Sequence, residues 1–332
     1  MKELIIAILL FIVGLILLIK GGDWFVDGAT NMAEIFRLPE ILIGATIVSI
    51  GTTLPEVMVS ATSAVSGHGD LAYGNAIGSI ICNTALIAAL TIAIKPSDAN
   101  RRSLFIPSLF FLIAAALYIF SAYVLQYFYR PFGILLLAVF CVYIFVSAKD
   151  AKKQQMLLPN TEAELTDNQI SDKDKKKIIV KDIILLIIGA ALITIGANLL
   201  VDNGTFIAKK IGIPESVIAL TFVALGTSLP ELVTAITALV KGHSSLSLGN
   251  LIGANILNIL LVAGVSITLS PFSLPKQPFF SLNRSLVLDI PIMLTVMGIL
   301  VIPPLINGKL KRWQGIVLLA IYAAFTTVQF VV

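Results

Sequence analysis

The sequence reads GTTLPEVMVS at residues 51–60 and GTSLPELVTA at residues 226–235. Each stretch sets a proline directly before a glutamate, Glu56 or Glu231, within a run that is otherwise mostly apolar. A carboxylate is costly in an apolar environment, and a proline removes a backbone hydrogen bond from a helix. Because the chain keeps both features twice, we infer that they serve a function.

The composition is that of a membrane protein. Of the 332 residues, 58% are apolar and only 13% are charged, whereas about 25% are charged in a typical soluble domain. A helix needs roughly 20 apolar residues to cross a bilayer core of about 30 Å, and the runs lack the alternation of transmembrane β-strands. We predict ten membrane-spanning helices, at residues 4–20, 41–65, 71–94, 104–126, 131–148, 180–202, 214–240, 246–270, 285–303 and 313–331.

The two halves of the chain are copies of one another. A shift of 175 positions aligns residues 39–83 with residues 214–258 without a gap, and 21 of the 45 aligned positions are identical. A shorter similarity, between residues 130–138 and 312–320, extends the duplication to the last span of each half. Each half has five predicted spans, so the second half must enter the membrane from the opposite side. Such inverted repeats, with broken helices around a midplane site, are typical of secondary transporters.

We therefore predict an all-α membrane protein in three parts: a first five-helix repeat (residues 1–148), a hydrophilic cytoplasmic linker (149–179) and a second, inverted repeat (180–332). The linker is rich in Lys, Asp, Gln and Asn, which is typical of a flexible connector. Most of the 23 Lys and Arg residues lie on the linker side. The positive-inside rule then predicts a multi-pass protein of the cell membrane with both termini outside. Cys82 and Cys141 are expected to be reduced core thiols.

The two Pro–Glu pairs can free backbone oxygens. A proline cannot donate to the carbonyl four residues back, so Pro55 releases the carbonyl of Gly51, and Pro230 releases that of Gly226. Within a bilayer, such carbonyls are tolerated only where other groups satisfy them or where they line a cavity. Hard cations such as Na⁺ and Ca²⁺ bind oxygen ligands. We interpret the predicted helix breaks as parts of a cation site at the membrane midplane.

Hydroxyl and amide side chains are repeated together with the glutamates. Thr52 and Thr227 each precede a glutamate by four residues, so each hydroxyl shares a helix face with a carboxylate. The next helix of each half has a polar stripe at i, i+4 and i+8: Asn75, Ser79 and Asn83, then Asn250, Ala254 and Asn258. Cation ligation and hydrogen bonding to neighbouring helices both explain these asparagines. Nearby glycines predict close helix contacts: Gly74, Gly78, Gly249 and Gly253.

The chain resembles prokaryotic sodium/calcium exchangers of the calcium/cation antiporter superfamily, in the paired motifs GTTLPE with GNAIGSIICN and GTSLPE with GNLIGANILN. The resemblance implies ten helices, of which the second, third, seventh and eighth form the ion-binding core while the first and sixth slide across it. It implies an antiporter rather than an enzyme, exchanging Na⁺ for Ca²⁺ by alternating access without an organic cofactor. Asn258 stands where the potassium-dependent branch has Asp, which implies K⁺ independence.

The resemblance also implies a set of metal ligands. Glu56 and Glu231 would be shared by Ca²⁺ and Na⁺, and Thr52 and Thr227 would complete the Ca²⁺ site. The remaining positions would be Thr53, Ser79 and the carbonyl of Ser49 at a cytoplasmic-side Na⁺ site, Ser228 and the carbonyl of Ala224 at an external-side Na⁺ site, and Asn83 and Asn258 beside the centre. Ala254 replaces a serine that is common in the family, so the external-side site lacks one oxygen.

Two other functions remain open from the residues alone. A Ca²⁺/H⁺ antiporter is one, because glutamates also carry protons, and a gated cation channel is the other. Two carboxylates give the site a charge of about −2, which one Ca²⁺ neutralises and three Na⁺ exceed, so exchange would move net charge. We expect Na⁺ and Ca²⁺ as partners (H⁺ in the alternative), a lipid bilayer around the chain, no nucleic acid, and function as a monomer. The paired His68 and His243 are expected in short surface loops.

Overall fold

A computed structural model describes residues 2–96, 99–156, 172–212, 226–276, 278–279 and 282–331 of the chain. The described part is nearly all helical. Its α-helices are α1 (Lys2–Ile35), α2 (Glu40–Ile43), α3 (Ser49–Val65), α4 (Gly69–Cys82), α5 (Ala89–Ile94), α6 (Arg101–Phe120), α7 (Arg130–Met156), α9 (Asp172–Lys210), α11 (Leu229–Val240), α12 (Ser244–Leu257), α13 (Gly264–Leu269), α14 (Ile290–Asn307) and α15 (Arg312–Val331).

Short π-helical segments join several of these helices, and four two-residue strands form two small antiparallel sheets. The π-helical segments are η1 (Gly44–Val48), η2 (Asn83–Ala88), η3 (Ser121–Leu125), η5 (Asn258–Ala263) and η6 (Ser285–Asp289). The strands are β1 (Tyr127–Phe128), β2 (Phe272–Ser273), β3 (Pro278–Phe279) and β4 (Leu282–Asn283). Strand β1, just before α7, pairs with β2, just after α13, and so joins the two predicted halves, and β3 pairs with β4.

Within the described residues, eight helical spans are long and apolar enough to cross a membrane: Lys2–Ile35, Glu40–Val65, Gly69–Ile94, Arg101–Leu125, Arg130–Gln154, Lys176–Lys210, Ser244–Leu269 and Ser285–Asn307. They coincide with eight of the ten predicted stretches. The predicted span 214–240 begins in residues 213–225, outside the described part of the chain, and its described remainder holds the 12-residue helix α11. The stretch 313–331 is the helix α15. The described chain is thus that of a multi-pass helical membrane protein.

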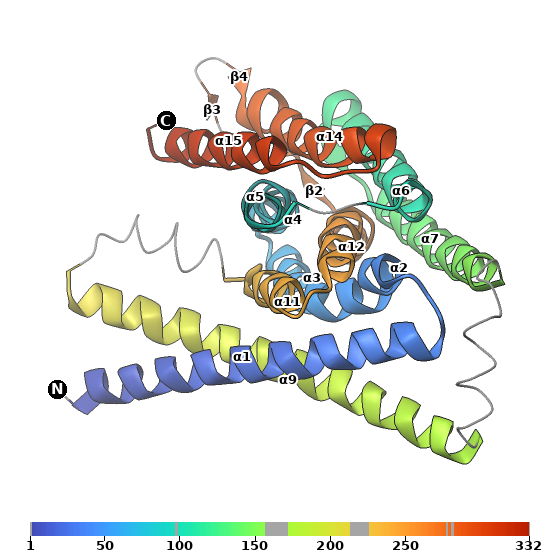
Figure 1. Cartoon of the computed structure of the whole chain (residues 1–332). Helices are drawn as coiled ribbons and strands as arrows, with labels where there is room; N and C mark the ends of the chain where they lie inside the picture. Colours follow the sequence, from blue (N-terminus) through green and yellow to red (C-terminus); the bar gives the residue numbers. More distant parts are fainter. Residues whose placement is uncertain are drawn as a thin grey trace.

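Helices α1 and α9 cross each other on one side of the molecule, beneath a central group that includes α3, α11 and α12 (Figure 1). Glycines bring α1 and α9 into backbone contact. A β carbon on Gly14 would lie 2.9 Å from the carbonyl oxygen of Gly196, and one on Gly21 would lie 2.9 Å from that of Gly189. The contacts run in opposite directions along the two helices, so the pair is antiparallel. A shift of 175 positions interchanges the two contacts.

Helices α1 and α9 are longer than predicted, with 34 and 39 residues. At 1.5 Å per residue these lengths are about 50 and 60 Å, well above the roughly 30 Å of a bilayer core. Asp23 and Asp27 lie beyond the predicted span 4–20, and Asp202 lies at the end of the predicted span 180–202, yet all three are inside these helices. No proline interrupts either helix, and the glycines near the predicted end of α1 pack against other helices, Gly21 against α9 and Gly22 against α11. Helices α7 and α9 also continue into the predicted linker, of which residues 157–171 lie outside the description.

The predicted helix break at Pro55 is wrong, because α3 continues through this proline. A proline removes one hydrogen bond, and the bonds on either side keep the helix intact. In the second half, α11 begins at Leu229, with Pro230 in its first turn, where a missing N–H costs little. The irregular segments lie elsewhere: η2 begins at Asn83 and η5 at the equivalent Asn258. Single-turn π segments are frequent at functional sites.

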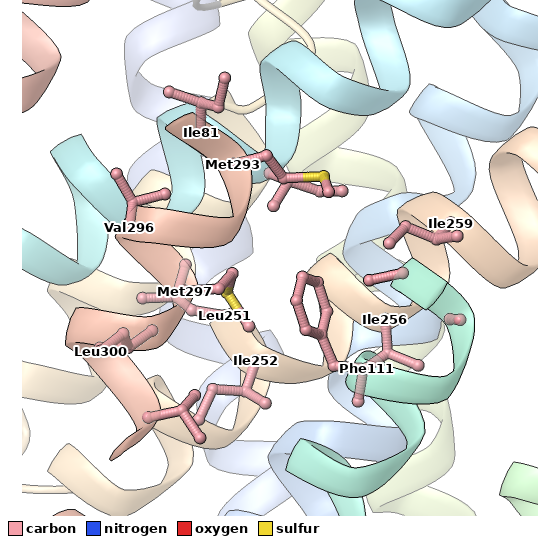
Figure 2. Packing of buried hydrophobic residues seen from close by; sticks show 14 of the residues in the cluster. Ile81, Phe111, Leu251, Ile252, Ile256, Ile259, Met293, Val296, Met297 and Leu300 are labelled. Atoms are coloured by element: carbon pink, nitrogen blue, oxygen red, sulfur yellow. The ribbon is translucent and has the colours of Figure 1, made fainter. Parts of the chain in front are cut away.

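A large apolar cluster supports the central helices. Figure 2 shows Met293 and Met297 of α14, Phe111 of α6, and Ile252 and Ile256 of α12 as members of this one cluster. All five side chains are buried. Close packing of this kind holds α12 and the π segment that follows it in a fixed position, and it thereby fixes the helices that carry the predicted site.

Candidate cation site

The two repeated glutamates are completely buried. Glu56 lies on α3 and Glu231 in the first turn of α11, and the exposed fraction of each is 0%. They are close enough for their charges to repel each other. Neither carboxylate has a hydrogen-bond partner or a basic side chain beside it among the described residues. A buried charge without such compensation is strongly unfavourable, so this pair requires a positively charged occupant or protons.

Several of the predicted ligands, the two glutamates included, have buried polar atoms without a hydrogen-bond partner in the described part of the chain. More than about 90% of buried polar groups in proteins form hydrogen bonds. Here, six predicted ligands have buried side-chain oxygens without a hydrogen-bond partner in the described part of the chain: Thr53, Glu56, Asn83, Ser228, Glu231 and Asn258. These six side chains have oxygen atoms that a bound cation could use as ligands; other buried polar atoms without a partner lie elsewhere in the described chain, for example at Tyr118 and Ser147.

Hydroxyl groups from one half lie beside the carboxylate of the other half. The hydroxyls of Thr52 and Thr53, on α3, lie close to the carboxylate of Glu231, on α11. Two hydroxyls of the first half therefore lie beside the carboxylate of the second half. Ser79, on α4, is buried at 4% exposure. The predicted carbonyl ligand of Ala224 lies outside the described residues.

The backbone around Ser49 is partly committed to internal hydrogen bonds. Ser49 is completely buried, and its hydroxyl donates to the carbonyl oxygen of Thr46 over 3.1 Å. The hydroxyl of Thr52 lies 3.4 Å from the carbonyl oxygen of Ser49, the atom that was predicted to bind Na⁺. This carbonyl therefore has a weak hydrogen-bond donor beside it, in addition to the backbone hydrogen bond of the helix α3, which begins at Ser49.

Glycine contacts press α12 against the start of the predicted second span. A β carbon on Gly249 would lie 2.2 Å from the carbonyl oxygen of Ile41, and one on Gly253 would lie 2.6 Å from the Cα atom of Ala45. The expected close helix contacts are therefore confirmed for these two glycines. For Gly74 and Gly78, no described atom lies within 4 Å of an added β carbon.

Two buried polar side chains near the site were not singled out from the sequence. Asn255 donates to the hydroxyl of Thr84 over 2.7 Å, but its repeat counterpart is Ile80, so the duplication gave no signal. Cys82, expected only as a core thiol, lies close to Ser228 and to both carboxylates. Its position directly before Asn83 was the available sequence signal. Both cysteines are free thiols, Cys82 buried and Cys141 exposed.

The chemistry of the site favours a hard cation. In the described part of the chain, no three His, Cys, Asp or Glu side chains lie together. Instead, two carboxylates are accompanied by hydroxyl and amide oxygens, the ligand types that Na⁺ and Ca²⁺ prefer. The fold and this centre define a class: multi-pass helical membrane proteins with a buried, acidic, oxygen-lined site between their helices.

The chain belongs to the sodium/calcium exchanger protein family, whose family model matches residues 6–149 and 181–331. It is 35% identical over 327 residues to an uncharacterized membrane protein of Methanocaldococcus jannaschii, with 96% of each chain covered. It is also 30% identical over 349 residues to the sodium/calcium exchanger MaX1 of Methanosarcina acetivorans, with 97% of this chain and 98% of the relative covered. Membership of this family supports cation exchange and indicates a transporter rather than an enzyme.

A solved structure has the same fold. The sodium-calcium exchanger NCX_Mj, soaked with 10 mM Na⁺ and zero Ca²⁺, matches with a TM-score of 0.78 and 31% identity, over 98% of this chain and 99% of that one. The same exchanger soaked with 2.5 mM Na⁺ and 0.1 mM Ca²⁺ matches with a TM-score of 0.77 and 30% identity. The likeness therefore extends over nearly the whole of both chains.

Proposed function

We propose that the chain is a secondary antiporter that exchanges Na⁺ for Ca²⁺ across the cell membrane by alternating access. One observation carries the proposal: Glu56 and Glu231, one from each half, are buried together among unmet oxygen atoms. An enclosed site of charge about −2 suits one Ca²⁺, and replacing that ion by Na⁺ gives a counter-ion for the return step. The exchanger relatives and the NCX_Mj likeness support this choice of ions.

The proposed architecture is ten helices in two inverted five-helix repeats, residues 1–148 and 180–332, joined by the linker 149–179. Reciprocal contacts support it. The Gly14–Gly196 and Gly21–Gly189 contacts interchange under the repeat shift. An inverted pair of repeats lets one central site face either side in turn. In this proposal, α1 and α9 slide across the core while the site stays in place.

The ligand set is part of the proposal. We assign Ca²⁺ and Na⁺ binding to the two glutamates and to the hydroxyl, amide and carbonyl oxygens around them: Thr52, Thr53, Ser49, Ser79, Asn83, Thr227, Ser228, Ala224 and Asn258. If three Na⁺ replace one Ca²⁺, each cycle moves one net charge, which is worth about 2.3 kcal/mol per 100 mV. Asn258 in place of Asp makes the exchange independent of K⁺. Both termini are placed outside, and one protomer suffices for transport.

The deciding experiment measures ⁴⁵Ca²⁺ uptake into proteoliposomes of the full chain. We expect uptake into vesicles loaded with Na⁺ and diluted into Na⁺-free buffer, and no uptake driven by a pH gradient alone. Uptake with only the pH gradient would identify a Ca²⁺/H⁺ antiporter instead, and flux without any counter-ion would identify a channel. A voltage clamp with valinomycin then reports the charge moved for each Ca²⁺.

A further inference from the structure

Two asparagines outside the proposed ligand set connect the two halves at the site. The hydroxyl of Thr52 donates to Oδ1 of Asn250 over 3.2 Å, and the hydroxyl of Thr227 donates to Oδ1 of Asn75 over 3.1 Å. Each bond joins a threonine of one Pro–Glu motif to the polar helix of the opposite half. A shift of 175 positions interchanges the two bonds, so the arrangement is built twice.

The hydrogen bonds of Asn75 fix the orientation of its amide. Its Nδ2 donates to the hydroxyl of Ser60 over 2.8 Å and to the carbonyl oxygen of Glu56 over 3.3 Å. A backbone carbonyl can only accept a hydrogen bond, so the amide nitrogen must face α3. The amide oxygen therefore faces Thr227, and the threonine has to be the donor. Asn75 thus links the backbone of one site carboxylate to a site hydroxyl of the other half.

The direction of these bonds matters for a cation. A threonine hydroxyl has one proton to donate and two lone pairs with which to accept. When the proton goes to an asparagine oxygen, both lone pairs remain available to a metal ion. Hydrogen bonds of this outer kind orient metal ligands, and their loss typically costs about 10–100-fold in metal affinity.

We propose that Asn75 and Asn250 are positioning residues: each holds a threonine hydroxyl of the opposite half with its lone pairs facing the transported cation. The inference rests on the proposed exchange activity and adds to it a specific pairing. Thr52 depends on Asn250, and Thr227 depends on Asn75. Each site hydroxyl is therefore oriented by the half of the chain that does not carry it.

The pairing is tested by double-mutant cycles in the full chain. The measured quantity is the Ca²⁺ concentration that gives half-maximal Na⁺-driven Ca²⁺ uptake. We expect Asn250→Ala and Thr52→Val each to raise this concentration by about 10-fold. The double variant should be no worse than either single variant, because both changes remove the same oriented hydroxyl. The matched control combines Asn250→Ala with Thr227→Val, where the two effects should multiply to about 100-fold. The proposal is overturned if the effects of Asn250→Ala and Thr52→Val multiply in the double variant as they do in the control. It is also overturned if Asn250→Ala leaves the half-saturating Ca²⁺ concentration unchanged.

Aspartate substitutions give a second test, which does not require the protein to fold with alanine at these positions. Nδ2 of Asn250 has no hydrogen-bond partner among the described residues, so Asn250→Asp keeps the only bond its side chain makes there. Asn75→Asp instead turns a carboxylate oxygen toward the carbonyl of Glu56. We expect half-saturating Ca²⁺ to stay at or below the wild-type value in Asn250→Asp and to rise about 10-fold or more in Asn75→Asp. The opposite order would overturn the proposal.

The wild-type protein separates failure of this inference from failure of the proposed function. If wild-type vesicles show no Na⁺-driven Ca²⁺ uptake, the proposed exchange is wrong and the cycles have no basis. If wild-type uptake is normal and the cycles show no specific pairing, the exchange stands and the positioning role is wrong.

Discussion

Glu56 and Glu231 have no basic partner among the described residues, so the first residue-scale prediction concerns their charge. Removing one partner of a buried charged set costs about 3–5 kcal/mol, so Glu56→Gln or Glu231→Gln should weaken Ca²⁺ binding by roughly 100-fold or more. Ligand at 100 times its dissociation constant stabilises a protein by about 2.7 kcal/mol. We therefore expect saturating Ca²⁺ to raise the melting temperature of the wild type and not that of either variant.

The control for this prediction is Glu34→Gln, which removes an exposed carboxylate of α1. This variant should keep both the Ca²⁺-dependent rise in melting temperature and the Na⁺-driven uptake. If Ca²⁺ still raises the melting temperature of the double variant Glu56→Gln/Glu231→Gln, the two carboxylates do not bind Ca²⁺.

The second residue-scale prediction concerns Ala254, which is completely buried on α12 and stands where the first half has Ser79. Ala254→Ser adds a hydroxyl oxygen at the position that lacks one. We expect half-saturating Na⁺ to fall by roughly fivefold, which corresponds to about 1 kcal/mol for one added polar contact. The matched control is Ala263→Ser, a buried alanine further along the same span. An unchanged Na⁺ titration in Ala254→Ser would remove the position from the Na⁺ site.

At this scale, repetition was the useful sequence signal. Glutamates and asparagines paired at a constant offset included Glu56, Glu231, Asn83 and Asn258, whose buried oxygens have no hydrogen-bond partner in the described part of the chain. The bond from Thr52 to Asn250 could not be predicted in the same way, because a sequence offset relates equivalent residues and says nothing about which residue of one half meets which residue of the other. Asn255 was missed because its counterpart is apolar.

At the scale of helices, hydrophobic length predicted the existence of the spans but not their ends or their local geometry. Spans of about 20 residues were expected for α1 and α9, but charged residues such as Asp23 do not end a helix when no proline or capping glycine follows. Pro55 was expected to break its helix, yet one missing hydrogen bond leaves α3 continuous. The π segments that begin at Asn83 and Asn258 depend on packing, which propensity alone does not encode.

The element-scale prediction tests the contact between α12 and the second span. A β carbon on Gly253 would lie 2.6 Å from the Cα atom of Ala45, and a backbone atom cannot rotate away. Gly253→Ala should therefore cost about 1–3 kcal/mol of stability, seen as a lower melting temperature in detergent. Gly298→Ala is the control, because its nearest neighbour would be Cδ1 of Ile302 at 3.7 Å. It should be neutral or slightly stabilising, since alanine favours a helix by about 1 kcal/mol. Equal effects of the two changes would contradict the close contact.

At the scale of the whole molecule, the duplication appears again in contacts that the sequence could not show. Gly133 of α7 packs against Thr268 of α13, and Gly315 of α15 packs against Ala93 of α5. The two pairs are equivalent: Ala93 and Thr268 are related by the shift of 175 positions, and Gly133 and Gly315 by the alignment of residues 130–138 with 312–320. The halves differ where α1 meets the turn between α11 and α12. There Lys241 pairs with Asp27 over 2.8 Å, whereas the equivalent of Lys241 in the first half is Ser66. The contact between α1 and α11 is therefore where the proposed sliding of α1 across the core is best tested.

The last prediction locks α1 to the core. A β carbon on Gly22 would lie 3.8 Å from that of Thr237 on α11, the mean separation in a disulfide, which is about 3.8 Å. In a background with the exposed Cys141 replaced by alanine, Gly22→Cys with Thr237→Cys should form a disulfide on oxidation. If α1 slides past the core in each cycle, the oxidised protein should lose Na⁺-driven Ca²⁺ uptake almost completely and regain it on reduction.

A cross-link within the moving pair provides the control for this experiment. A β carbon on Gly196 of α9 would lie 3.1 Å from that of Leu17 on α1, within a few tenths of an ångström of the disulfide range of about 3.5–4.5 Å. Because α1 and α9 are proposed to move together, Leu17→Cys with Gly196→Cys should keep uptake when oxidised. If oxidation leaves uptake intact in the α1–α11 variant, α1 does not slide over the core during exchange, and the site must change its exposure by movement of the central helices themselves.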